Sequence, residues 1–201
     1  MQMQHTEVPQ VLGIVGSPRR GGNTETLVDE VLAGAAEAGA HVAKVILAEC
    51  DIRPCRACDQ CAELGRCSQE DAMAALLAQM EASAVWVLGT PVYWWGPTAQ
   101  FKAFIDRWYG AGRAVQFRGR AVILVVPLGD GVERTARHTV GMMEDSLRYV
   151  KAQLVAKIVA PGLMHVGDAQ GQPALLSAAR RAGREAVALR ASSVGKKRGD
   201  K

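Results

Sequence analysis

Four of the five cysteines in this chain stand within thirteen residues, at a spacing of C-x2-C-x2-C-x5-C. Four thiolates so close together suit a cube-shaped iron–sulfur cluster, because its ligands can come from one wrapping loop. Zinc sites more often use two C-x2-C pairs that a longer spacer separates. Simple packing would instead scatter cysteines through the core. The pattern favours a 4Fe–4S cluster, with zinc or no metal as alternatives, and the candidate ligands are Cys55, Cys58, Cys61 and Cys67.

The composition narrows the class of protein and the redox environment of these thiols. The chain has 201 residues, of which 49% are hydrophobic and 22% charged, as expected of one ordinary globular domain. Its first residues, MQMQHTEVPQ, lack the basic segment and apolar run of a secretory signal. No stretch approaches about eighteen consecutive apolar residues, so we expect no membrane span. We therefore expect a cytoplasmic protein with reduced thiols, which disfavours disulfides.

The formal net charge of +4 is concentrated at the end of the sequence. The last six residues, KKRGDK, carry four cationic side chains and one acidic side chain, so the remainder is nearly neutral. We expect residues 193–201 to form a basic, disordered tail and residues 1–10 an N-terminal tail. Since there is no basic helix face with interleaved aromatic side chains, we do not expect nucleic acid as a partner.

A small, polar loop, GSPRRGGNT at 16–24, follows the first apolar run. Where such a loop leads into a helix, unsatisfied backbone N–H groups and the positive end of the helix dipole suit a phosphate group. The loop lacks the endings of a Walker loop and of a dinucleotide fingerprint. The alternative is a plain turn with Asn23 as a helix cap. Hydroxyl, amide and guanidinium groups favour phosphate binding, and the candidate contacts are Ser17, Arg19, Gly22, Asn23 and Thr24.

The segment TPVYWWGPTAQFKAFIDRW at 90–108 contains three of the four tryptophans. We expect its first part to form a rigid, exposed turn against which a flat ring system can lie, and its residues are Pro91, Val92, Tyr93 and Trp94. Alternatively, Trp94 and Trp95 lie in the core or in an oligomer contact. We interpret Asp106 and Arg107 as residues that form salt links at a helix end, and not as catalytic residues. Helical spacing places the following side chains in the core: Phe101, Phe104, Ile105 and Trp108.

Apolar runs alternate with helical periodicity along the sequence. The runs predict buried strands at 11–15, 41–47, 84–89, 121–127 and 157–166, apolar throughout. Helices are predicted between and after them, at 24–38, 72–82, 97–108, 135–151 and 173–190. This alternation predicts one α/β domain over 11–192, with a cysteine-rich loop at 50–71. The expected fold is a flavodoxin-like, doubly wound, five-stranded parallel sheet of order 2-1-3-4-5, with helices on both faces and ligands beyond the carboxyl ends of the strands.

Three motifs together resemble the flavodoxin-like NAD(P)H-dependent FMN reductase family, and most closely its iron–sulfur flavoprotein branch. They are GSPRRGGNT, the cysteine cluster followed by EDAM, and TPVYWWGPTAQFKAFIDR, in order over residues 10–190. The resemblance implies FMN, with its phosphate in the 17–24 loop and its ring against 91–94. It also implies that PLGDG at 127–131 closes over the ring through Gly129, although relatives commonly have a Thr-x-Gly-like start there. The family resemblance further implies a homodimer or homotetramer with the flavin near an interface.

We therefore expect an oxidoreductase whose chemistry is carried by FMN, since the sequence has no catalytic triad or paired carboxylates. One form would take hydride from NAD(P)H and pass electrons to a quinone, a metal ion or another small acceptor. The other would take electrons from a ferredoxin-like carrier through the cluster. The alternatives are a cluster-free NAD(P)H:FMN or quinone reductase, and a non-enzymatic, zinc-stabilised binding module on the same scaffold.

Overall fold

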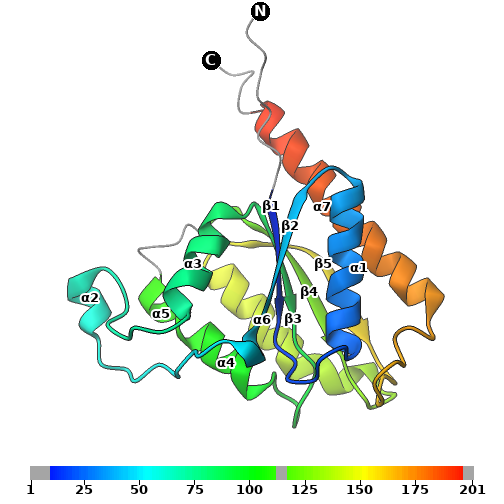
Figure 1. The fold of residues 1–201 in the computed structure, drawn as a ribbon, viewed down its shortest axis with the longest axis horizontal. Helices are drawn as coiled ribbons and strands as arrows, with labels where there is room; N and C mark the ends of the chain where they lie inside the picture. Colours follow the sequence, from blue (N-terminus) through cyan, green and yellow to red (C-terminus); the bar gives the residue numbers. More distant parts are fainter. Residues whose placement is uncertain (1–9, 112–116, 197–201) are drawn as a thin grey trace, which may run out of the picture.

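A parallel sheet of five strands forms the centre of the chain, in the order β2-β1-β3-β4-β5 (Figure 1). The computed structural model describes residues 10–111 and 117–196, with side chains through residue 190. Neighbouring strands are parallel throughout this sheet, which confirms the predicted flavodoxin-like α/β fold. The strands are β1 (Gln10–Val15), β2 (His41–Ile46), β3 (Val85–Gly89), β4 (Ala121–Pro127) and β5 (Gln153–Ala160).

Helices cover both faces of the sheet (Figure 1). One face is covered by α1 (Asn23–Glu37) and α7 (Pro173–Lys196). The other face packs against α3 (Met73–Ala82), α4 (Ala99–Asp106), α5 (Trp108–Ala111) and α6 (Arg137–Tyr149). Short elements complete the described chain: 3-10 turns at Leu47–Glu49 and Glu133–Ala136, and α2 (Gln60–Leu64) in the cysteine-rich loop.

Alternation along the central strands fills both sides of the core. In β1, Leu12 and Ile14 pack with the α3 and α4 side, whereas Val11 and Val15 pack with the α1 side. This follows from the period of two along a strand, so a strand buried on both faces must be apolar at every position. Every residue of β3 and β4 is buried, but β2 and β5 are edge strands with exposed positions. The expectation of apolar character throughout therefore holds for the centre and is wrong at the edges.

Several predicted boundaries need correction. The fifth strand covers 153–160 rather than 157–166, because Pro161 cannot donate to the sheet and Gly162 has a φ of 78°. The predicted helix at 97–108 is two helices, α4 and α5, and Thr98 caps the first by accepting a hydrogen bond from the Phe101 N–H. The last helix continues to residue 196, so part of the expected tail at 193–201 is helical. Residues 1–9 and 197–201 lie outside the described residues.

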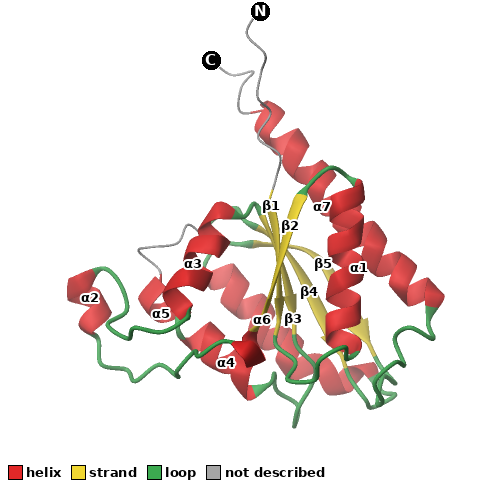
Figure 2. Ribbon diagram, in the orientation of Figure 1, coloured by secondary structure: helices red, strands yellow, loops and turns green. Residues whose placement is uncertain are grey.

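The loops that follow the strands gather at one end of the sheet, because all strands run the same way (Figure 2). These loops contain the polar and aromatic motifs that the sequence marks as candidate sites, and the cysteine-rich loop extends from the end of β2. Within the described ranges, no helix has both the length and the apolar character to cross a membrane.

Candidate functional site

The loop between β1 and α1 is held tightly against β3 and α4. The Gly16 N–H donates to the Gly89 carbonyl at 2.7 Å, and the Thr98 hydroxyl donates to the Gly16 carbonyl at 2.5 Å. A Cβ on Gly16 would lie 2.7 Å from Phe101 Cδ2 and 3.0 Å from the Gly89 oxygen. A larger residue at position 16 would therefore push the loop out of place.

The first turn of α1 has the properties of an anion site. No side chain caps this helix, whose N-cap is Gly22. Ser17 and Thr24 are only 3% and 2% exposed beside it, and the Ser17 hydroxyl accepts the Arg19 N–H at 3.1 Å. The free N–H groups and the helix dipole favour a negatively charged group at this end. The residues present here fit the phosphate of FMN.

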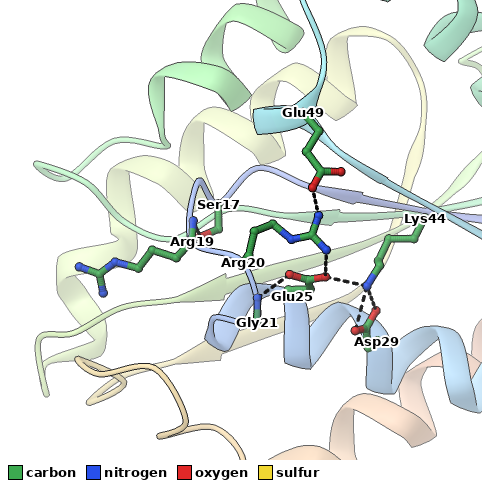
Figure 3. Close-up of polar contacts among 8 residues, drawn as sticks. All are labelled: Ser17, Arg19, Arg20, Gly21, Glu25, Asp29, Lys44 and Glu49. Carbon is green, nitrogen blue, oxygen red and sulfur yellow. Dashed lines mark hydrogen bonds and ion pairs between the residues drawn. The ribbon is translucent and has the colours of Figure 1, made fainter.

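The buried carboxylate of Glu25 holds the same loop in place through hydrogen bonds and ion pairs. Glu25 accepts hydrogen bonds from the Gly21 N–H at 2.8 Å and from Lys44 at 2.8 Å. Arg20 lies between Glu25, at 3.4 Å, and Glu49. Figure 3 shows Arg19 pointing away from this network, with its guanidinium free of the acidic side chains drawn there. The two neighbouring arginines thus differ in role, because Arg20 holds the loop whereas Arg19 faces the site.

The side-chain amide of Asn23 holds a neighbouring loop in place. Its Nδ2 donates to the carbonyls of Leu163 and His165 at 3.1 and 2.8 Å. Its Oδ1 accepts the Ala169 N–H at 3.0 Å. The alternative of Asn23 as the cap of α1 is wrong, because the N-cap is Gly22 and the Asn23 side chain instead fastens the 163–169 segment to the start of α1.

The aromatic turn after β3 is strained and exposed. Tyr93 and Gly96 exchange two backbone hydrogen bonds, of 2.8 and 3.0 Å, around Trp94 and Trp95. The two tryptophans have φ values of 49° and 61°, as in tight hairpin turns that usually contain Asn or Gly. They are 89% and 48% exposed, so the alternative that they belong to the core is wrong.

The loop after β4 is shaped by Asp130. Its carboxylate accepts the Val132 N–H at 3.0 Å and the Thr135 hydroxyl at 2.6 Å. The bond from Thr135, with that from Val132, lowers the pKa of Asp130. A Cβ on Gly129 would lie 2.8 Å from Met164 Sδ, so Gly129 allows the loops after β4 and β5 to come together.

One pocket brings these loops together at the carboxyl ends of the strands. All predicted cofactor contacts except Trp94 line it, namely Ser17, Arg19, Gly22, Asn23, Thr24, Pro91, Val92, Tyr93 and Gly129. Pro127 and Leu128, from the PLGDG segment that the family resemblance places over the ring, also line it. The wall that sequence reasoning missed comes from the loop after β5, and its residues are Leu163, Met164 and Val166. In the sequence, only Pro161 and Gly162 indicate that β5 ends before these residues.

The four clustered cysteines border a second pocket, beside α5. Cys55 and Cys58 are exposed, Cys61 and Cys67 are half-buried, and all are free thiols. No three His, Cys, Asp or Glu side chains of the described residues lie close enough together to hold a metal ion. The cysteines therefore share a pocket without forming a closed ligand set, and their role as metal ligands stays a prediction.

Local electrostatics distinguish Cys58 from the fifth cysteine. Hydrogen bonds with the Gln60 backbone and the Ser68 hydroxyl lower the pKa of Cys58. Burial, with the charge of Glu49, raises the pKa of Cys50. Since the thiolate is the form that binds metals, this difference agrees with Cys50 standing outside the predicted ligand set.

A buried ion pair joins both ends of the cysteine-rich loop to α4. The side chains of Arg107 and Asp71 are 1% and 0% exposed, and two bonds of 2.5 and 3.1 Å connect them. Arg107 also donates to the Arg53 carbonyl at 2.8 Å. Asp106 bonds to Lys102 at 2.6 Å, so both residues form salt links near the end of α4, as the sequence predicts. Burial opposes ionisation of Asp71, but the Arg107 bond and two backbone N–H bonds keep its pKa low.

Known proteins are similar to this chain in sequence and in fold. The family model for NADPH-dependent FMN reductase matches residues 9–162. An iron–sulfur flavoprotein from Methanocaldococcus jannaschii is 41% identical over 98 residues, 49% of this chain and 51% of the relative. Another from Archaeoglobus fulgidus is 36% identical over 111 residues, 55% of this chain and 50% of the relative. The chain spans about half the length of the curated relatives it matches.

Solved structures support the fold. A Bacillus anthracis azoreductase has a TM-score of 0.70 at 18% identity, over 89% of this chain and 100% of that one. An NAD(P)H:quinone oxidoreductase from Methanothermobacter marburgensis has a TM-score of 0.67 at 19% identity, over 88% and 96%. The sheet order and the position of the pocket define a flavodoxin-like protein. The chain belongs to the NADPH-dependent FMN reductase family, near its iron–sulfur flavoprotein branch.

Proposed function

We propose that this chain binds FMN in the pocket at the strand ends and transfers electrons through it, from NAD(P)H or a ferredoxin-like carrier to a small acceptor. One observation carries the proposal: residues from separate loops, predicted as FMN contacts from sequence motifs, line a single pocket. Family membership supports the same cofactor and favours a redox protein over a zinc-stabilised binding module.

Different residues of the pocket would contact the phosphate and the ring of FMN. The first turn of α1, with the Ser17 hydroxyl and the Arg19 guanidinium, would bind the phosphate. Tyr93 and Val92 would support the ring, while Leu128 and Leu163 would exclude water from one side. FMN, when bound, supplies the chemistry of accepting hydride and passing on electrons. No side chain is needed as an acid or base in this scheme.

We also propose that Cys55, Cys58, Cys61 and Cys67 hold a 4Fe–4S cluster. The donor set fits, because four thiols border one pocket and four Cys thiolates are the usual ligands of such clusters. A cluster would supply one-electron transfer. The names of the similar archaeal flavoproteins support this proposal.

The first test is the absorption spectrum of protein purified without oxygen, with iron, sulfide and zinc assays on the same sample. Flavin bands with about four irons per chain would establish an iron–sulfur flavoprotein. Absence of flavin, even after FMN is added, would refute the proposed function.

A second candidate is a cluster-free NAD(P)H-dependent reductase. It is favoured by the absence, among the described residues, of a group of three side chains that could share a metal. Flavin bands without iron or zinc, even after anaerobic reconstitution with iron and sulfide, would decide for it. Reduction of the bound flavin by NADH, NADPH or reduced ferredoxin would then identify the electron donor.

The phosphate contact can be tested by comparing FMN with riboflavin, which lacks the phosphate. Arg19→Gln should weaken FMN binding about tenfold and leave riboflavin binding nearly unchanged. The matched control is Arg20→Gln, because Arg20 bonds to Glu25 and Glu49 instead of lining the pocket. Equal losses of FMN affinity in both variants would show that the general field of the loop, and no specific Arg19 contact, binds the phosphate.

We further propose a homodimer or homotetramer in which the turn at 93–96 contacts a second copy. The exposed Trp94, adjoining a pocket-lining tyrosine, supports this arrangement. Sedimentation or light scattering should show an oligomer that Trp94→Ala weakens, whereas a monomeric wild-type protein would refute the proposal.

A further inference from the structure

One polar group beside the cysteines has no partner. Arg107 Nε is buried without a hydrogen bond, in a residue that is only 2% exposed. Arg107 lines the same pocket as Cys55, Cys58, Cys61 and Cys67. A buried N–H without an acceptor is costly, so this donor needs an explanation.

The rest of the guanidinium is already committed. Both terminal nitrogens bond to Asp71, and one of them also donates to the Arg53 carbonyl. Because the group is planar and fixed by these bonds, Nε is the donor left over. Burial alone would lower the pKa of Arg107, but the bonds and charge of Asp71, with weaker hydrogen-bonding and charge contributions from the Cys67 sulfur, raise it. The side chain is therefore a fixed cation.

The backbone of α5 also comes close to the cysteines. A Cβ on Gly110 would lie 3.5 Å from the Cβ atoms of Cys61 and Cys67, and 3.7 Å from Cys61 Sγ. Gly110 and Arg107 belong to the same short stretch between α4 and the end of α5. This stretch therefore presents both close packing and an unpaired donor to the cysteine pocket.

We propose that Arg107 is a positioning residue for the cluster at these cysteines: its Nε–H donates to a cluster sulfur, and its charge raises the reduction potential of the cluster. This inference rests on the proposed cluster. Each one-electron reduction adds negative charge, which a nearby cation stabilises, and hydrogen bonds to sulfur act in the same direction. Asp71 opposes the effect from further away, since it does not line the pocket.

The opposing charges allow a sharp test by anaerobic redox titration, with the reduced cluster followed by electron paramagnetic resonance. Asp71→Asn removes the carboxylate charge and should raise the midpoint potential above that of the wild type. The double variant with Asp71→Asn and Arg107→Gln should have a midpoint potential below those of the wild type and of Asp71→Asn. Since both members of the ion pair are neutral in this variant, no buried charge is left unpaired. If the double variant matches Asp71→Asn alone, or if Asp71→Asn fails to raise the potential, the proposal is overturned.

The control is Arg120→Gln, a partly buried arginine that donates to the Ser83 and Glu81 carbonyls at 3.0 and 2.9 Å. It does not line the cysteine pocket, so the potential should not change. If the double variant does not fold, Arg107→Lys tests the role of Nε instead. Lysine keeps the positive charge but has no Nε donor, so the reduction potential of the cluster should fall. An unchanged potential in that variant would refute the role of Nε.

Iron content separates this inference from the proposed function. Wild-type protein without iron after reconstitution refutes the cluster and, with it, the role of Arg107. Wild-type protein with the cluster, combined with unchanged potentials in the variants, refutes Arg107 alone. Loss of iron from a double variant that keeps its FMN and its circular dichroism spectrum would support the inference, because the donor would then be needed to retain the cluster.

Discussion

Glu25 shows how a single buried carboxylate can maintain the phosphate-binding loop. It is 6% exposed and accepts bonds from Gly21 and Lys44. Burial by itself would raise the pKa of Glu25, but the Lys44 and Gly21 bonds and the charges of Lys44 and Arg20 lower it. Since the folded pKa is below the unfolded one, the network stabilises the fold above the ordinary pKa of 4.5. That contribution is lost as the pH falls through the folded value.

Glu25→Gln should therefore lower the free energy of unfolding by about 1–2 kcal/mol at neutral pH, because Lys44 and Arg20 each lose the charge of one of their two partners. The difference from the wild type should shrink as the pH falls below the ordinary pKa of 4.5 and through the lowered pKa of the folded protein, where the wild-type carboxylate becomes neutral. Denaturant unfolding at several pH values measures this. Glu185→Gln, on the exposed part of α7, is the control and should change stability by less than about 0.5 kcal/mol. A loss in Glu25→Gln that is independent of pH would contradict the charge argument.

Asn23→Ala should release the loop that forms the missed wall of the pocket. The variant loses its bonds to the carbonyls of Leu163 and His165 and to the Ala169 N–H. We expect faster hydrogen exchange in 163–169 and about tenfold weaker FMN binding. Thr26→Ala is the control, because it removes one bond from α1 to the neighbouring Gln170. Weaker binding without faster exchange would mean that Asn23 contacts the cofactor instead of holding the loop.

At the scale of elements, α1 and α7 approach so closely that only glycine fits between them. A Cβ on Gly34 would lie 1.8 Å from the Arg180 carbonyl oxygen, and one on Gly183 would lie 2.0 Å from that of Val31. Alanine normally favours a helix over glycine by about 0.5–1 kcal/mol. Here, however, the obstacle is backbone, which cannot move without separating the helices.

Gly34→Ala should thus destabilise the protein by about 1–3 kcal/mol, in spite of the helix preference of alanine. Gly141→Ala is the matched control, because Gly141 lies within α6 with open space around it. It should stabilise by about 0.5–1 kcal/mol. Thermal and denaturant unfolding of both variants check the two signs, and a stabilised Gly34→Ala would show that the helices can separate at little cost.

The elements that could be predicted from sequence are those whose environment is uniform. Strands β3 and β4 are buried at every position, so their apolar runs were sufficient. Strand β5 lies at an edge and is partly exposed, so its apolar pattern marks the end of the strand less clearly. The predicted strand therefore extends too far, over Leu163, Met164 and Val166. The salt link of Arg107 was predictable but its partner was not, because Asp71 is distant in sequence and helical spacing reveals only neighbours three or four residues away.

The loops after β1 and β3 were predictable as sites because their residue types are unusual for plain turns. The Gly-rich segment at 16–24 and the Pro-aromatic segment at 90–96 each carry a local signature, and the parallel sheet brings their ends together. Local sequence signatures cannot reveal which of two similar neighbouring residues contacts the ligand and which one holds the loop. Arg19 and Arg20 have the same chemistry in sequence, but in the structure Arg20 bonds to Glu25 and Glu49, whereas Arg19 lines the pocket and donates to the Met164 carbonyl at 3.3 Å.

At the scale of the whole molecule, the cofactor pocket is built by loops from four of the five strands. A ligand that binds there contacts segments from residue 17 to residue 166. Unfolding any one of the contributing strands would remove part of the site. Binding should therefore stabilise the fold as a unit, because the unfolded chain cannot assemble these contacts.

FMN at about one hundred times its dissociation constant should stabilise the protein by about 2.7 kcal/mol. For a chain of this size, that corresponds to a rise in Tm of about 5–10 °C. Riboflavin at the same concentration should give a smaller rise, since it offers the uncapped start of α1 no phosphate. A thermal melt with each ligand measures both effects. Equal rises in Tm would show that the loop at 16–24 does not bind the phosphate. A rise with FMN alone would place the phosphate at the first turn of α1, and Arg19→Gln should then reduce that rise.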